Sequence, residues 1–141
     1  MNARNRELRA NVTCVAIDGK GLLIEGPPGS GKSTLALMLI DRGAELVGDD
    51  GIEIERRGDT VWAHPPETIR GQMEIRGVGI VTLPAVSAPL SLVIEFDPAA
   101  PRLPEPRSRG ILDLALPLLA FRPEGQALAL RAERALRLLG I

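Results

Sequence analysis

The stretch Leu22–Ile40, LLIEGPPGSGKSTLALMLI, decides how this sequence is interpreted, because it joins a short apolar run to a glycine-rich loop and then to a second apolar run. Its centre, Gly26–Ser33, fits the complete P-loop pattern G-x-x-x-x-G-K-S. That motif requires a strand before the loop and a helix after it. Leu22–Glu25 predicts the strand and Ser33–Arg42 predicts the helix. The sequence therefore predicts an α/β fold organised around a phosphate-binding loop.

The residues of this loop have separate chemical roles. Glycines at both ends let backbone N–H groups converge on phosphates, and the following helix adds the positive end of its dipole. Lys32 is placed to reach the β- and γ-phosphates, and the hydroxyl of Ser33 to bind Mg²⁺. We expect ATP and Mg²⁺ as cofactors, with the nucleotide bound by Gly26, Pro27, Pro28, Gly29, Ser30, Gly31, Lys32, Ser33 and Thr34.

Composition limits the class of protein. A chain of 141 residues with 45% hydrophobic content suffices for one domain. The net charge is −1, and the acidic and basic residues are scattered along the chain without a basic stripe, so we expect no nucleic-acid partner. Cys14 is the single cysteine, and no apolar run has the length of a membrane span or a signal peptide. These features predict a cytoplasmic protein without membrane association.

The other elements are predicted from short apolar runs between turn residues. Residues 97–109 hold four prolines and predict an exposed loop, and Gln126–Leu139 has helical spacing. His64, the one histidine, is expected to end a strand at the surface. The expected strands are Val12–Ile17, Leu22–Glu25, Leu46–Val47, Ile52–Arg56, Val61–His64, Ile80–Leu83 and Leu90–Phe96, and a further apolar run covers Leu114–Phe121.

Three carboxylates are candidates for the chemistry, because phosphoryl transfer needs one to hold Mg²⁺ and often another to accept a proton. Asp49 and Asp50 close a strand one helix after the loop, which in a βαβ unit places them beside it. Glu74 is the third candidate. Asp97, at the end of the apolar strand 92–96, equally fits the metal-binding acid of an ordinary P-loop ATPase. The residues alone leave this choice open.

Together with the loop, four further stretches resemble the catalytic domain of HPr kinase/phosphorylase, in the short form found in proteobacteria. The resemblance covers nearly the whole chain from about Asn11, and it implies a tail over residues 1–10 and a catalytic domain over residues 11–141. The fold that it implies is a single PEP-carboxykinase-like nucleotide-binding domain with a mixed sheet. The four stretches are Leu35–Ala44, Leu46–Asp50, Glu74–Ile80 and Arg102–Glu105.

The resemblance implies an enzyme that moves a phosphoryl group between ATP, or pyrophosphate, and a serine of an HPr-type phosphocarrier protein in a phosphotransferase regulatory system. Phosphorolysis is the reverse reaction. Asp50 would exchange the proton of that serine, and Asp49 would orient Asp50 or the metal. The site residues so implied are the catalytic Asp50, Asp49, Lys32 and Arg102, with Ser33 and Glu74 as Mg²⁺ ligands.

The resemblance also implies how partners assemble. Glu74–Val81 and Phe121–Gln126 would form the surface of the reaction site and of carrier-protein docking. The family forms hexamers, so we expect a homo-oligomer.

Two positions depart from the family pattern. Asn11 stands where the family has an active-site histidine, and asparagine cannot take up a proton near neutral pH. Thr34 replaces an acidic residue that commonly follows the loop serine. Two other functions therefore stay open: a nucleotide-binding regulatory or sensor module with little turnover, and a small-molecule kinase.

Overall fold

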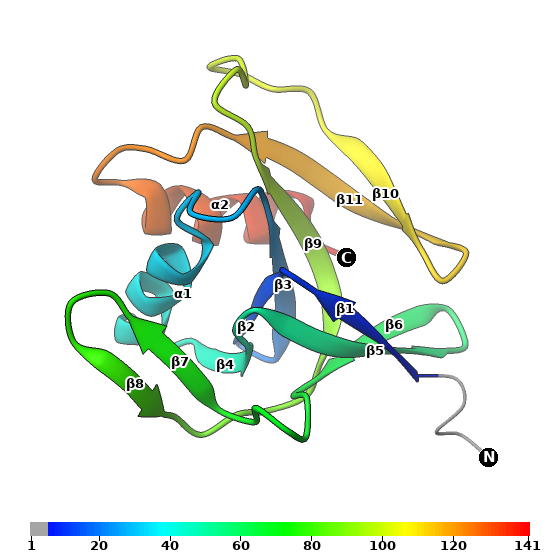
Figure 1. Ribbon diagram of the computed structural model, residues 1–141. Coiled ribbons are helices and arrows are strands. Elements are labelled where there is room, and N and C mark those ends of the chain that lie inside the picture. Colours follow the sequence, from blue (N-terminus) through cyan, green and yellow to red (C-terminus); the bar gives the residue numbers. More distant parts are fainter. Residues whose placement is uncertain (1–5) are drawn as a thin grey trace.

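The computed structural model describes residues 6–141, which form a curled mixed sheet with two helices packed on one face (Figure 1). The hairpin of β7 (Gln72–Ile75) and β8 (Gly79–Thr82) stands apart from that sheet, and the helices are α1 (Lys32–Asp41) and α2 (Leu128–Leu139). The strands of the main sheet are β1 (Arg6–Ala10), β2 (Thr13–Ile17), β3 (Lys20–Glu25), β4 (Glu45–Gly48), β5 (Gly51–Arg57), β6 (Thr60–His64), β9 (Ala88–Phe96), β10 (Arg107–Ile111) and β11 (Leu114–Phe121).

Strand β3 is central, between the parallel strand β9 and the antiparallel strand β2. β4 pairs with β2, so the strands that α1 connects are parallel but are separated by one strand. β9 pairs with β6 near its start and with β11 near its end. The sheet therefore divides at β9, with β11 and β10 on one branch and β6, β5 and β1 on the other.

The apolar runs of the sequence are buried on both faces of this sheet. In β3, Leu22 and Ile24 contribute to the core beneath the helices, and Leu23 contributes to a second core on the opposite face. α1 and α2 cover the first core with Leu39 and Leu136 among others. Each buried leucine or isoleucine stabilises the fold by about 1.5–3 kcal/mol. The strand that precedes the glycine-rich loop is therefore among the most firmly packed parts of the molecule.

The second core also holds the single cysteine. The side chain of Cys14 on β2 is fully buried, and this burial raises the pKa of its thiol well above the ordinary value. Within residues 6–141, neither helix is long and apolar enough to cross a lipid bilayer.

Most of the predicted elements are confirmed, including the hairpin of β2 and β3, helix α1 and the brief strand β4. The tail expected over residues 1–10 is corrected, because Arg6–Ala10 pairs with β5 as strand β1, and residues 1–5 lie outside the described part. The expected loop over residues 97–109 ends earlier, since β10 begins at Arg107 and pairs with β11.

His64 does end a strand, but it is buried rather than at the surface, with 5% of its area exposed. Its Nε2 lies 2.7 Å from the carboxylate of Glu55, and its Nδ1 lies 2.7 Å from the hydroxyl of Ser87. The same carboxylate oxygen accepts hydrogen bonds from Arg57. A buried polar group needs such partners, so this network explains how the histidine is accommodated at the end of β6.

Replacing Glu55 by Gln tests that network. The hydrogen bond from His64 holds the pKa of this carboxyl below its ordinary value of 4.5 against the opposing effect of burial, and Arg57 and Arg6 add to the lowering. A lowered pKa means that this stabilisation is complete above about pH 4.5 and is lost as the pH falls through the folded-state pKa. We expect Glu55→Gln to lower the thermal midpoint by about 3–8 °C at pH 7, and by less in acid.

The half-buried neighbour Glu53, which lies 3.7 Å from Arg6, supplies the control. Glu53→Gln should change the midpoint by about 2 °C or less at either pH. Equal effects of the two substitutions in thermal unfolding would contradict the structural role of Glu55.

Candidate active site

The glycine-rich loop, residues 26–33, leaves the end of β3 and enters α1. Gly31 takes a left-handed conformation with φ 102°, and its carbonyl accepts the N–H of Leu35 as the helix begins. An α-helix leaves its first N–H groups without intrahelical partners, and here no side chain caps them. Backbone donors and the positive end of the helix dipole are therefore directed at the cavity beside the loop.

Lys32 closes this loop on itself. Its Nζ donates hydrogen bonds to the carbonyl oxygens of Gly26 at 2.6 Å and Pro27 at 3.1 Å. A Cβ atom on Gly26 would lie 2.8 Å from the Ser30 hydroxyl and 3.0 Å from the Phe96 Cβ, so the start of the loop is closely packed. The ammonium group is thus held across the loop by neutral acceptors that an anion can replace.

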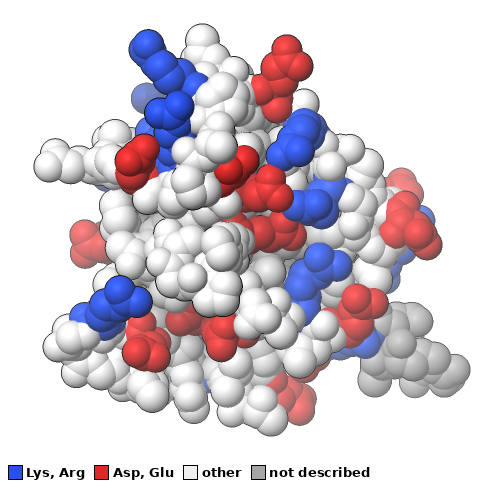
Figure 2. Space-filling model, turned by 45° about the horizontal axis from the view of Figure 1, so that its top comes forward, with Lys and Arg blue, Asp and Glu red and all other residues white. Residues whose placement is uncertain are grey.

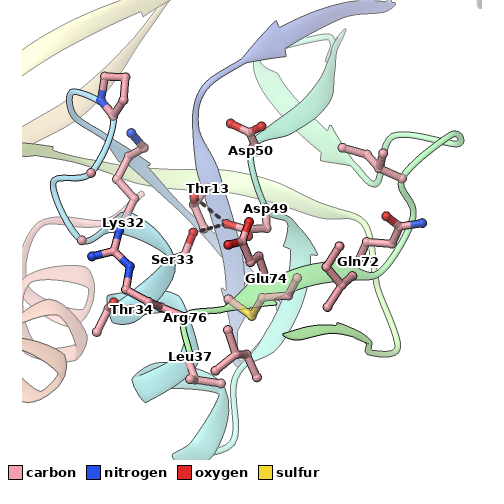
Figure 3. Close-up of a pocket in the computed structure, with 17 residues that line it drawn as sticks. Thr13, Lys32, Ser33, Thr34, Leu37, Asp49, Asp50, Gln72, Glu74 and Arg76 are labelled. Carbon is pink, nitrogen blue, oxygen red and sulfur yellow. Dashed lines mark hydrogen bonds between the residues drawn. The ribbon is translucent and has the colours of Figure 1, made fainter. Parts of the chain in front are cut away.

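Asp49 connects three segments of the chain (Figure 3). Its Oδ1 accepts hydrogen bonds from the Ser33 hydroxyl at 2.6 Å and from the Thr13 hydroxyl at 3.1 Å, and the residue is 8% exposed. Because Ser33 donates its proton to Asp49, the lone pairs of its oxygen stay available for a cation. The expected proximity of the acid pair to the loop is confirmed, although β2 separates β3 from β4.

Asp50 follows in a tight corner between β4 and β5. A Cβ atom on Gly48 would lie 2.2 Å from the carbonyl oxygen of Gly51, so only glycine fits there. Asp50 itself has φ 63°, an uncommon conformation for a residue with a side chain. Unlike Asp49 it is exposed, which leaves its carboxylate accessible to a reactant.

A cavity of about 670 Å³ collects these groups. The loop and α1 form one wall, Thr13, Asp49 and Asp50 form a second, and the hairpin of β7 and β8 forms a third (Figure 3). That hairpin contributes Glu74 and Arg76 to the lining. The volume lies in the range of small-molecule and cofactor sites.

The structure brings together most of the residues predicted from the sequence. The loop residues Gly26, Pro27 and Ser30 shape the loop without lining the cavity. Those that line it are Pro28, Gly29, Gly31, Lys32, Ser33, Thr34, Asp49, Asp50 and Glu74.

Two predicted or alternative residues lie outside this lining. Arg102 is exposed in the proline-rich loop. The Asp97 carboxylate accepts a hydrogen bond from the Ala99 N–H at 2.9 Å, where it caps a turn. Geometry therefore favours Asp49 and Asp50 over Asp97, the choice that the residues alone left open.

Two polar residues of the cavity, Thr13 and Gln72, were not predicted from the sequence, and Arg76 was predicted only as part of the surface Glu74–Val81. Thr13 lies on β2, and its contact with Asp49 depends on the pairing of β2 with β4, which no local pattern reveals. Arg76 lies in the turn that directly follows β7, and it lines the cavity together with Glu74.

The oxygen donors fit a magnesium ion. Ser33, Asp49 and Glu74 offer hard oxygen ligands on the walls of one cavity. Across the described residues, no group of three or more His, Cys, Asp or Glu gathers as a protein-only metal site. Magnesium commonly takes one or two carboxylates and completes its shell with water and substrate phosphates, which suits a site of this kind.

The charged groups nearest the loop also form a network outside the cavity. Arg109 on β10 binds Glu25, which precedes the loop, at 2.8 Å and Glu95 on β9 at 2.9 Å. Figure 2 shows that acidic and basic side chains are interspersed over the visible face of the molecule. The salt bridges of Arg109 therefore tie the strand end before the loop to the branch of the sheet that β10 and β11 form.

A curled mixed sheet that presents a glycine-rich loop to a pair of acids defines a mixed α/β domain with a candidate active site at that loop. More particularly, the chain belongs to the HPr serine kinase C-terminal domain family, which matches residues 4–87. This match confirms the resemblance that the sequence motifs indicated.

Individual relatives agree with the family. The chain is 39% identical over 89 residues to an HPr kinase/phosphorylase of Clostridium acetobutylicum, an alignment that covers 63% of this chain and 29% of the relative. It is 45% identical over 76 residues to an HPr kinase/phosphorylase of Streptococcus sanguinis, covering 52% and 24%. The chain thus spans less than a third of the length of these curated relatives.

A solved structure covers more of the chain. The HPr(Ser) kinase/phosphatase from Coxiella burnetii superposes with a TM-score of 0.82 at 29% identity, over 93% of this chain and 88% of that one. The expected α/β fold with a mixed sheet is confirmed by this match.

Substitution at Gly48 tests the corner that carries the acid pair. Gly48→Ala should destabilise the protein by about 2–4 kcal/mol in urea unfolding, because the new methyl group meets backbone atoms that cannot move aside. Gly110→Ala on exposed β10 meets nothing within 4 Å and should stay within about 0.5 kcal/mol of the unsubstituted protein. Equal midpoints for the two variants would refute the tight corner.

Proposed function

We propose that this chain is an ATP- and Mg²⁺-dependent phosphotransferase domain that phosphorylates a serine of an HPr-type carrier protein and catalyses the reverse phosphorolysis. The observation that carries the proposal is the division of the acid pair. Asp49 is buried against two hydroxyls, whereas Asp50 is exposed in the same cavity. Membership of the HPr serine kinase family supports this assignment of substrate.

The loop and Lys32 bind the triphosphate. Backbone N–H groups at the start of α1 face the cavity, and the lysine exchanges its contacts with Gly26 and Pro27 for phosphate oxygens. Such an exchange pairs the lysine ammonium with an ionised acceptor in place of a neutral carbonyl, which strengthens its hydrogen bonds. ATP binding thus uses groups that the fold already holds in place.

Ser33, Asp49 and Glu74 hold the magnesium ion. Bound there, the ion supplies positive charge that offsets the charge of the phosphates during transfer. Thr13 keeps the Asp49 carboxylate oriented through its hydrogen bond to Oδ1, and the second oxygen of that carboxylate stays available.

Asp50 is the general base. Its carboxylate accepts the proton of the carrier's serine hydroxyl as the serine oxygen bonds to the γ-phosphorus and the bond to ADP breaks. In phosphorolysis an oxygen of inorganic phosphate bonds to the phosphorus of the phosphoserine, the bond to the serine oxygen breaks and pyrophosphate forms, and the protonated Asp50 returns its proton to that serine oxygen. Exposure of Asp50 gives a protein substrate access to the proton acceptor.

Arg76 supplies the second positive charge of the cavity, in addition to Lys32. We assign to it the stabilisation of charge on the transferring group. The family resemblance predicted this role for Arg102. Arg102 lies outside the cavity lining, and its role in catalysis remains an untested prediction.

The carrier docks on the hairpin of β7 and β8. Val78 and Ile80 on this hairpin are 75% and 70% exposed, beside the cavity that Glu74 and Arg76 line. An exposed apolar tip next to a reaction site suits a transient protein substrate. The second predicted docking segment, residues 121–126, and a hexameric assembly remain parts of the proposal carried by the family resemblance.

A sensor module with little turnover is the alternative, favoured by Asn11 in place of the family histidine. Incubation with γ-labelled ATP, Mg²⁺ and a purified HPr-type carrier separates the two. We expect phosphoserine on the carrier. Tight nucleotide binding without any phosphoserine would establish the sensor, and transfer to a metabolite without carrier would establish a small-molecule kinase.

Asp50→Asn should reduce transfer by about 10²–10⁴-fold, since the amide cannot accept the proton, while the nucleotide dissociation constant changes little. Asparagine tolerates the left-handed conformation of this position, so the corner is preserved. Asp113→Asn, at an exposed turn with φ 64°, is the matched control and should transfer normally. Full activity of Asp50→Asn would exclude it as the base.

Thr13→Val should weaken Mg²⁺-dependent nucleotide binding about 5- to 10-fold, because it removes one of the two donors that fix Asp49 and keeps the side-chain shape. Binding measured in EDTA should not change, and Thr13→Ser should behave like threonine. A fluorescent-nucleotide titration with and without Mg²⁺ gives the comparison. Identical affinities for the Val and Ser variants would remove Thr13 from the site.

A further inference from the structure

Two residues with unusual backbone conformations face each other beside the cavity. Asn11 and Asp50 both have φ 63°, in the left-handed region that residues with side chains rarely occupy. The N–H of Asn11 donates a hydrogen bond to the carbonyl oxygen of Asp50 at 3.3 Å. A backbone hydrogen bond thus connects the proposed base directly to Asn11, the residue with the same conformation on the neighbouring chain segment.

The sheet explains why both residues turn at the same level. β1 pairs with β5 up to the partners Ala10 and Gly51, and β2 pairs with β4 from the partners Cys14 and Gly48. Two antiparallel segments therefore cross together from the pair β1–β5 to the pair β2–β4. Residues 11–13 and 49–50 form this double corner, and Asn11 and Asp50 make the left-handed turn in each segment.

The Asn11 side chain takes no direct part in the cavity. It is exposed and is not among the residues that line the site. Between residues 6 and 141, no group forms a hydrogen bond with the side-chain amide of Asn11. Asparagine is, however, one of the few residues with a side chain that adopt the left-handed conformation readily.

We infer that Asn11 is a positioning residue for Asp50. Its left-handed backbone directs its N–H at the Asp50 carbonyl, and this contact holds the second corner in the conformation that presents the Asp50 carboxylate to the cavity. What position 11 requires is therefore a backbone conformation and not a side chain that exchanges protons. The inference rests on the proposed function, because it assumes that Asp50 is the base.

Two substitutions separate these requirements. Asn11→Gly removes the side chain and keeps the conformation, whereas Asn11→Val places a β-branched residue where φ is positive. In carrier phosphorylation we expect Gly to retain kcat within about 2-fold, and Val to lower kcat at least about 5-fold, with KM for ATP unchanged in both. Equal losses in both variants, or full activity of Val, would overturn the inference.

Asp113→Val is the matched control, since it introduces the same strain at φ 64° in the exposed turn between β10 and β11. It should lower the thermal midpoint about as much as Asn11→Val and leave kcat unchanged. A parallel loss of kcat in the control would assign the effect to general instability and contradict the positioning role.

Hydrogen exchange gives a readout that does not depend on catalysis. In Asn11→Val the amides of residues 10–12 and 49–51 should exchange at least about 5-fold faster than in Asn11→Gly, because the double corner opens more often. If the unsubstituted protein transferred no phosphate, the proposed function would fail and this measurement would still test the corner. Equal exchange in the two variants would refute the coupling between Asn11 and Asp50.

Discussion

The arrangement of the site depends on one feature: a single carboxylate oxygen of Asp49 accepts hydrogen bonds from the hydroxyls of Thr13 and Ser33. Thr13 comes from β2, Ser33 from the first turn of α1, and Asp49 from the end of β4. The sheet brings the ends of these elements close together, and the two hydrogen bonds join the loop directly to the acid pair. Because the carboxylate is nearly buried, losing either donor leaves a poorly solvated charge.

The packing around this point assigns different roles to neighbouring residues. β3 is buried on both faces, so the start of the glycine-rich loop is fixed, and Arg109 ties Glu25 to the adjacent strand β9. Two consecutive aspartates then differ in exposure, because the corner after Gly48 turns one inward and the other outward. A buried ligand and an accessible proton acceptor follow from backbone geometry and require no difference in residue type.

Much of the fold was predictable because its signals are local. The loop motif, the apolar runs of β3 and β9 and the glycine that ends α1 each act within a few residues, and they located the acid pair correctly. β1 was missed because Arg6–Ala10 is largely polar and becomes a strand only through pairing with β5. The burial of His64 depends on Glu55 and Ser87, and the contact of Thr13 with Asp49 depends on strand order. Such pairings between distant segments have no signature in a single sequence.

The burial of Cys14 has a practical consequence. A thiol with a raised pKa and no exposed surface stays protonated and out of reach of maleimides and iodoacetamides, and the chain has no other cysteine. The natural sequence therefore serves as an unreactive background for site-directed labelling. A cysteine introduced at the exposed tip of the β7–β8 hairpin, such as Val78→Cys, can carry a fluorophore or spin label whose signal reports on the approach of another protein.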